Sequence, residues 1–152
     1  MDILSTLQKN AGVNRTTSYT AAFLVSTWII VYMLHVPFWI AGNMNRTMVH
    51  HYYYTEMKLS LIFDFVLIAM YFMAAEWIIK RLSVRSLWKK IIVVLGTTIA
   101  ISGSFCLYFL LQPMTSLFFS RWFHKVKGWA VLYDCILIAF TYLLYQIFMK
   151  LT

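Results

Sequence analysis

Four long apolar runs dominate the sequence, and each is long enough to cross a membrane as a helix. They cover residues 20–41, 59–79, 90–111 and 129–149. The hydrocarbon core of a bilayer is about 30 Å thick, so a spanning helix needs about 20 mainly apolar residues. The sequence therefore predicts an all-α integral membrane protein with four transmembrane helices, in which residues 1–152 form a single membrane domain.

Composition argues against a water-soluble domain. Hydrophobic residues make up 62% of the chain and charged residues 12%, about half of the ~25% charged share of ordinary soluble proteins. The 13 Lys and Arg against 5 Asp and Glu give a net charge of +8, but the basic residues lie in the gaps between apolar runs. There they suit anionic lipid headgroups or the acidic loops of a partner. We therefore expect membrane lipids as partners, and no nucleic acid.

The basic residues also predict the orientation of the chain. The turn at 80–90 (KRLSVRSLWKK) contains five Lys or Arg and no acid, and the positive-inside rule places such a turn on the cytoplasmic or matrix side. Because there are four spans, both termini are expected on that side too. The first 20 residues lack the apolar core of a cleavable signal peptide. A mitochondrial inner membrane, a prokaryotic membrane and a viral membrane all suit this pattern.

The two halves of the chain resemble each other at an offset of 70 residues. Residues 62–80 (IFDFVLIAMYFMAAEWIIK) align without a gap with residues 132–150 (LYDCILIAFTYLLYQIFMK), which pairs Asp64 with Asp134. Self-similarity at a fixed offset indicates an internal repeat. We therefore predict two duplicated helical hairpins, about 20–80 and 90–150, in parallel orientation around a pseudo-two-fold axis along the membrane normal.

Each hairpin has an outer loop that is rich in aromatic and basic residues. In the second loop, the sequence SLFFSRWFHKVKGW predicts a short helix lying in the membrane interface. A similar helix is expected at the N-terminus, with Asp2 near its start. Candidates for contact with lipid headgroups in the second loop are Arg121, Trp122, Lys125 and Lys127.

Asp64 and Asp134 are the first candidates for a functional site. Each lies roughly one to two helical turns inside the outer end of its span, where a carboxylate normally faces protein, a partner or water. Helical spacing places Tyr71 on the face of Asp64, and Thr141 and Tyr145 on the face of Asp134. The pair could bind a proton or a cation. Alternatively, each carboxylate anchors an Arg, a Lys or a Tyr hydroxyl from an outer loop.

Two further polar residues lie within the spans. Glu76 precedes Lys80 by one helical turn, which favours a local ion pair near the inner interface. His35 lies two residues before Pro37, which is expected to bend or end the first helix. His35 could ligate haem or titrate in a proton pathway. Haem between helices usually needs two histidines at matched depth, and no other span contains one, so we expect neither a cofactor nor a metal ion.

A stripe of small residues on the third span predicts close helix packing. Gly96, Ala100 and Gly103 follow one another at helical spacing, and small side chains let helix backbones approach closely in a membrane. The partner helix could belong to the same bundle or to another subunit.

The function expected from these features is structural. The sequence contains no phosphate-binding loop, nucleophile elbow or metal-binding motif, so we do not expect an enzyme. The aromatic surface, the small-residue stripe and the basic loops favour a non-catalytic subunit that packs into or helps assemble a larger membrane protein complex, such as one of the mitochondrial inner membrane. The protein partners expected are other membrane subunits or further copies of the chain. The alternative is a small oligomeric transporter or channel that uses Asp64 and Asp134. A third hypothesis is an enzyme that acts on lipid through His35, His50 or His124.

Overall fold

The computed structural model describes residues 3–151 of the chain, with side chains described from Asn14 onward. This part is mainly helical and contains no strands. Its elements in chain order are α1 (Ile3–Thr27), the π-helical η1 (Trp28–Met33), α2 (Val36–Ala41), the 3₁₀ turn η2 (Asn43–Asn45), α3 (Arg46–His50), the π-helical η3 (His51–Thr55), α4 (Met57–Arg81), α5 (Leu87–Leu111), α6 (Phe118–Val126) and α7 (Gly128–Leu151).

Within the described residues, four helices are long and apolar enough to cross a membrane, which confirms the number of spans expected from the sequence. Three of them, α4, α5 and α7, agree with the predicted spans to within three residues at each end. The first span runs from Asn14 to Met33, so the predicted end at residue 41 was wrong.

The first span ends early because the chain breaks at His35. This residue has a left-handed backbone conformation, with φ at 52°, and Pro37 then lies in the first turn of α2. A continuous helix would need an N–H at position 37 to bond the carbonyl of Met33, and proline has none. The Nδ1 of His35 lies 3.2 Å from that carbonyl oxygen and can donate to it instead. Pro37 therefore prevents the helix from continuing, and the change of backbone conformation occurs two residues earlier, at His35.

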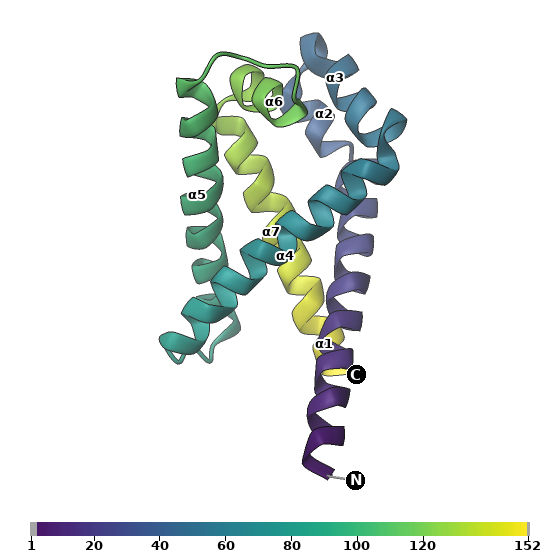
Figure 1. Ribbon diagram of the computed structural model, residues 1–152, viewed down its shortest axis with the longest axis vertical. Coiled ribbons are helices and arrows are strands. Elements are labelled where there is room, and N and C mark those ends of the chain that lie inside the picture. Colours follow the sequence, from purple (N-terminus) through teal and green to yellow (C-terminus); the bar gives the residue numbers. More distant parts are fainter. Residues whose placement is uncertain (1–2, 152) are drawn as a thin grey trace.

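The helices form a bundle with two distinct ends (Figure 1). α1 and α5 run in one direction, and α4 and α7 run in the other. The short helices α2, α3 and α6 gather at one end, which we call the cap end. The beginning of α1, the end of α7 and the turn between α4 and α5 lie at the opposite end, which we call the terminal end.

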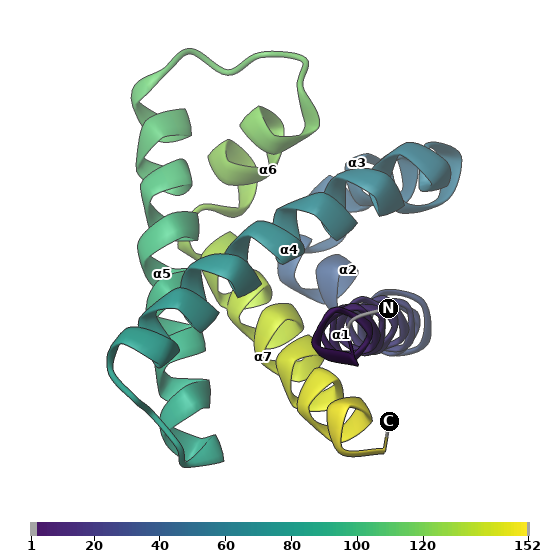
Figure 2. The same ribbon diagram turned by 60° about the horizontal axis from the view of Figure 1, so that its bottom comes forward.

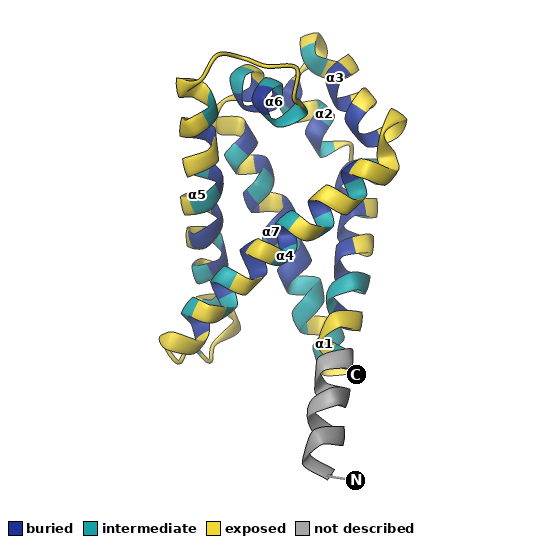
Figure 3. Cartoon of the chain, in the orientation of Figure 1, coloured by how far each residue is buried: buried dark blue, intermediate teal, exposed yellow. Residues whose placement is uncertain are grey.

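α7 is the central helix of the bundle. It packs along α5 on one side and along α1 on the other, whereas α4 crosses the bundle obliquely and packs mainly on α5. Buried hydroxyl pairs reinforce this packing, such as Ser26 on α1 with Thr141 on α7 at 2.6 Å. Polar groups need such partners where lipid excludes water. Figure 3 shows that the exposed faces of α1, α4 and α5 look outward.

The two hairpins share an outline but differ in their short elements and in their packing. Each has two long helices joined by short helical structure at the cap end, which is the one helix α6 in the second hairpin and a series of short segments in the first (α2, η2, α3 and η3). In the second hairpin, α5 and α7 pack along each other. In the first, α1 and α4 meet around Tyr19, whose ring contacts Phe65 and Phe72, and then diverge toward the terminal end (Figure 2). Duplication therefore stays a prediction, because the shared outline fits it but the short elements and the packing differ.

Of the two extra helices predicted at the membrane interface, the described chain contains one. α1 is continuous from Ile3 into the first span, so the separate N-terminal helix is not found in the described chain, and Asp2 lies outside the described residues. The helix predicted in the second outer loop is present as α6.

Candidate functional site

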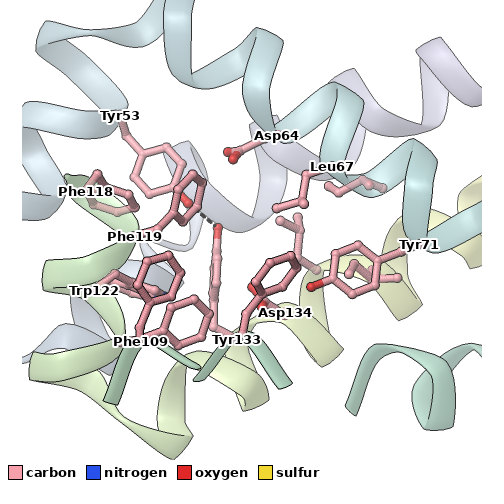
Figure 4. Close-up of a pocket in the computed structure, with 15 residues that line it drawn as sticks. Tyr53, Asp64, Leu67, Tyr71, Phe109, Phe118, Phe119, Trp122, Tyr133 and Asp134 are labelled. Atoms are coloured by element: carbon pink, nitrogen blue, oxygen red, sulfur yellow. Dashed lines mark hydrogen bonds between the residues drawn. The ribbon is translucent and has the colours of Figure 1, made fainter. Parts of the chain in front are cut away.

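A cavity of about 140 Å³ lies between α4, α5, α6 and α7 near the cap end, and both aspartates of the candidate spans line it (Figure 4). Most of its wall is aromatic. The lining residues are Tyr53, Asp64, Leu67, Ile68, Tyr71, Phe105, Phe109, Phe118, Phe119, Trp122, Phe123, Tyr133, Asp134, Leu137 and Ile138.

Asp64 reaches the cavity from α4 and is bonded by a residue of the cap-end segment between α1 and α4. It shares a buried face with Ile68, Tyr71 and Ala75, as the helical spacing predicts. The hydroxyl of Tyr52 in η3 donates a hydrogen bond to Asp64 Oδ1 at 2.9 Å. Asp64 therefore accepts a hydrogen bond from a tyrosine of this cap-end segment, a contact that fits one of the two roles expected for it.

Asp134 reaches the same cavity from α7, but its partner comes from a span. Ser102 on α5 donates a short hydrogen bond to Asp134 Oδ2. Ile138 and Thr141, on the same face of α7, are buried as expected. No outer-loop Arg, Lys or Tyr hydroxyl donates to Asp134 in the described part of the chain. The partner of this carboxylate was not anticipated, because nothing in the sequence indicates which serine faces it.

The two carboxyl groups share the cavity without a basic residue. Both line its wall, and no Lys, Arg or His is found among the described residues that line the cavity. Carboxylates that lose their hydration and face a like charge are strongly disfavoured unless something neutralises them. A proton or a bound cation would supply this neutralisation.

Tyrosine hydroxyls supply most of the remaining polar groups around the cavity. Tyr53 and Tyr133 pair through their hydroxyl oxygens at 2.9 Å, as the dashed line in Figure 4 shows. Burial raises the pKa of the Tyr52 hydroxyl, and the nearby charge of Asp64 raises it further. Burial likewise raises the pKa of Tyr53, with smaller contributions from Tyr133 and Asp64. Both loop hydroxyls therefore stay protonated and can donate hydrogen bonds.

α6 closes the cavity at the cap end through aromatic contacts. Phe118 stacks on Tyr52, with ring centroids 3.7 Å apart. Trp122 packs edge-on against Tyr133 at 5.8 Å. These contacts connect α6 to η3 and α7, so the helix of the second outer loop and the segment of the first loop together form the roof of the site.

The inward orientation of Trp122 corrects one expectation. Trp122 is only 3% exposed, so the prediction that it contacts lipid headgroups was wrong, because the apolar face of α6 is turned onto the cavity. Lys125 and Lys127 are exposed, and Arg121 is partly buried. The Nε of Arg121 has no hydrogen-bond partner among the described residues.

Glu76 and His35 lie outside the cavity. Tyr142 on α7 donates a hydrogen bond to Glu76 Oε1 at 2.7 Å. The expected ion pair between Glu76 and Lys80 is absent from the described chain, because this part of α4 turns Glu76 toward α7. His35 is exposed at the break between η1 and α2.

The small-residue stripe of α5 lies on the outside of the bundle. Gly96 and Ala100 are exposed and Gly103 is partly buried, and a Cβ added at either glycine would meet no atom of the described chain within 4 Å. The stripe therefore makes no close contact within this bundle, and a contact with another subunit stays a prediction. The buried face of α5 consists of Val94, Thr97, Thr98, Ser102 and Cys106.

The fold and the cavity define a small, all-helical protein with four candidate membrane spans and an acidic, aromatic cavity between them. Comparison with known proteins finds no matching family model, no similar curated protein and no similar solved structure. Among the described residues, no group of three or more His, Cys, Asp or Glu is placed to hold a metal ion. The chemistry of the site is therefore inferred from its geometry.

Proposed function

We propose that this protein is a small membrane transporter or channel that binds a proton or a small cation at Asp64 and Asp134. The observation that carries the proposal is the convergence of two carboxyl groups, from α4 and α7, on one cavity that has no basic residue in its described wall. Ionisable residues within spans are costly, and they commonly mark the path of an ion or a proton. A transporter or channel that uses these two aspartates is the alternative function that the sequence suggested.

The cavity wall suits a positively charged ligand in two ways. The carboxyl oxygens of Asp64 and Asp134 provide negative charge, and the hydroxyls of Tyr53 and Tyr133 provide further oxygen ligands. The faces of the surrounding aromatic rings attract cations through their quadrupoles, and this attraction is stronger where water is excluded. Protons on the carboxyl groups, or a cation bound in the cavity, would offset this negative charge.

Flux measurements on reconstituted protein test the proposal. Purified protein in liposomes is assayed for proton flux with an internal pH-sensitive dye, and for uptake of small monovalent cations. Asp64→Asn and Asp134→Asn keep the size of the side chain and remove its charge, and each is expected to reduce flux at least about tenfold, since removal of a group that acts directly costs about 1.4 kcal/mol or more. Gel filtration and circular dichroism check that the variants fold.

Glu76→Gln is the matched control. It also removes an acid within a span, but Glu76 lies outside the cavity and bonds Tyr142. Retention of flux in this variant together with loss in both aspartate variants would support the cavity as the site. Wild-type flux in folded Asp64→Asn and Asp134→Asn proteins would refute the proposal. If an asparagine variant does not fold, Asp64→Glu, which keeps the charge, must retain flux.

A second candidate is the non-catalytic subunit of a larger membrane complex, and the exposed small-residue stripe favours it. Gly96 and Ala100 present a flat face on α5 that no described residue covers, and such faces support close helix contacts between subunits. Extraction in a mild detergent, native electrophoresis and mass spectrometry would identify any assembly that contains the chain. Migration as the free chain would argue against this role.

Site-specific cross-linking sharpens the second test. The native Cys106 and Cys135 are both free and buried, so a cysteine introduced at Ala100 is the accessible one. Oxidative cross-linking of Ala100→Cys in native membranes is expected to give a defined larger species. Met70→Cys, at an exposed position of α4, is the control. Equal cross-linking of both variants would indicate random collision rather than an interface at the stripe.

A further inference from the structure

A second hollow in the molecule shares no lining residue with the aspartate cavity. It is a groove of about 730 Å³ on the side where α1 and α4 diverge toward the terminal end (Figure 2). α1 and α4 form its walls, and α7 contributes Tyr145, Gln146 and Met149 between them. The lining residues on the walls are Arg15, Thr16, Tyr19, Phe65, Ala69, Phe72, Met73, Glu76, Trp77, Lys80 and, from α5, Lys90.

The groove is apolar along most of its length. Its α4 wall presents Phe65, Ala69, Phe72, Met73 and Trp77. Between Phe65 and Lys80 the helix rises about 22 Å, at ~1.5 Å per residue. This length exceeds one leaflet of a bilayer, which is about half of the ~30 Å hydrocarbon core. An acyl chain of a single leaflet therefore fits along this wall.

The end of the groove is basic. Arg15 on α1, Lys80 on α4 and Lys90 on α5 line it at the terminal end, against one acid, Glu76. Three positive charges and one negative charge give the lining a net charge of +2. Glu76 accepts a hydrogen bond from Tyr142 within the bundle, so the three basic residues remain available for a ligand with negative charge.

We infer that this groove binds an anionic phospholipid, with an acyl chain along α4 and the phosphate-bearing headgroup among Arg15, Lys80 and Lys90. The phospholipid and the groove are both apolar for most of their length and charged at one end. The charges are opposite, because the headgroup is negative and the end of the groove is positive. Basic pockets between membrane helices recognise anionic headgroups in this way. The groove is independent of the aspartate cavity, so this inference does not depend on the proposed transport function.

Lipid retention measured by native mass spectrometry tests the inference. Delipidated protein is incubated with an equimolar mixture of phosphatidylglycerol and phosphatidylcholine that carry the same acyl chains. Wild-type protein is expected to retain phosphatidylglycerol in preference to phosphatidylcholine. Each basic residue replaced in the groove should reduce this preference about fivefold, since one basic residue near anionic lipid contributes roughly 1 kcal/mol. The groove variant combines Arg15→Gln, Lys80→Gln and Lys90→Gln.

A matched control removes the same charge from the same end of the molecule. It combines Arg81→Gln, Arg85→Gln and Lys89→Gln, three exposed residues that do not line the groove. This control is expected to keep the preference for phosphatidylglycerol. Ala69→Trp fills the apolar part while leaving every charge in place, and should reduce retention of both lipids.

Four results would overturn the inference. Equal loss of preference in the groove variant and in the control would show that the attraction is diffuse. Equal retention of both lipids by wild-type protein would show that there is no headgroup site. A protein segment that co-purifies with the chain and is lost on Ala69→Trp would show that the groove accommodates another helix. Inorganic phosphate that displaces phosphatidylglycerol at millimolar concentration would likewise show that the site takes the free ion.

Discussion

The hydrogen bond between Tyr52 and Asp64 gives a sharp test of how the cavity is held together. Tyr52→Phe removes one hydroxyl and preserves the ring that stacks on Phe118 at 3.7 Å. Asp64 then loses the one hydrogen bond that a described side chain donates to it, at 2.9 Å. A buried acceptor left without its donor costs about 1–3 kcal/mol, and a charged one costs most. We therefore expect Tyr52→Phe to destabilise the protein by about 2 kcal/mol.

The interaction energy is separated from other effects by a double-mutant cycle. Asp64→Leu replaces the carboxylate with an apolar group of similar size, and Tyr52→Phe then removes a hydroxyl that has already lost its acceptor. Replacing both partners by apolar groups is much less costly than removing one. The double variant should therefore be more stable than the sum of the single variants predicts, by about 1–3 kcal/mol.

Unfolding by SDS in mixed micelles, followed by far-UV circular dichroism, measures these free energies. Tyr53→Phe is the control, because the Tyr53 hydroxyl pairs with Tyr133 rather than with a carboxylate. A neutral hydrogen bond contributes about 1 kcal/mol, so this change should cost less than Tyr52→Phe. If the effects of Tyr52→Phe and Asp64→Leu on the free energy of unfolding add to within about 0.5 kcal/mol, the hydrogen bond between Tyr52 and Asp64 does not stabilise the protein, and the reasoning is refuted.

Further measurements address other parts of the structure. Lys127 joins α6 to α7 with φ at 55° and ψ at −135°, a backbone conformation that disfavours residues with a Cβ. Lys127→Gly should therefore stabilise the protein by about 1 kcal/mol in SDS unfolding. A loss of stability would contradict this. Gly96→Ala should stabilise the isolated chain by up to about 1 kcal/mol, because the added methyl group meets no described atom within 4 Å and alanine favours helix. The raised pKa values of Tyr52 and Tyr53 predict stability that is unchanged below pH 10, the ordinary pKa of tyrosine, and falls as the pH rises above it. The unfolded tyrosines lose their protons first, so a flat stability profile above pH 10 would refute the burial of these hydroxyls.

The parts of the fold that the sequence predicts well are those that follow from apolar runs and from helical periodicity. The spans at α4, α5 and α7 follow from uninterrupted apolar runs, and the buried face of Asp64, Ile68 and Tyr71 follows from their spacing. The break at His35 was placed too late. Pro37 cannot donate a hydrogen bond to the carbonyl of Met33, and the His35 ring lies beside that carbonyl instead. The apolar content of the run does not indicate this arrangement.

The candidate site could be predicted only in part for the same reason. Spacing within a helix indicates which residues share a face, but not what the neighbouring helix contributes. The two aspartates were recognised from the offset between the halves, whereas their partners Tyr52 and Ser102 depend on how α5 and η3 pack. Trp122 was assigned to the surface because α6 carries aromatic and basic residues in close succession. Only the three-dimensional packing shows that the tryptophan faces the cavity.

The aspartate cavity draws its two carboxyl groups from different hairpins, and this has a consequence for biosynthesis. Asp64 belongs to α4, which leaves the ribosome before α5, and Asp134 belongs to α7, which follows α5. Chains that stop after α5 carry half of the acidic pair, together with its tyrosine partner in η3. The complete cavity therefore forms only when α7 has been inserted between α1 and α5. A ligand that requires both carboxyl groups would distinguish finished molecules from nascent ones in the membrane.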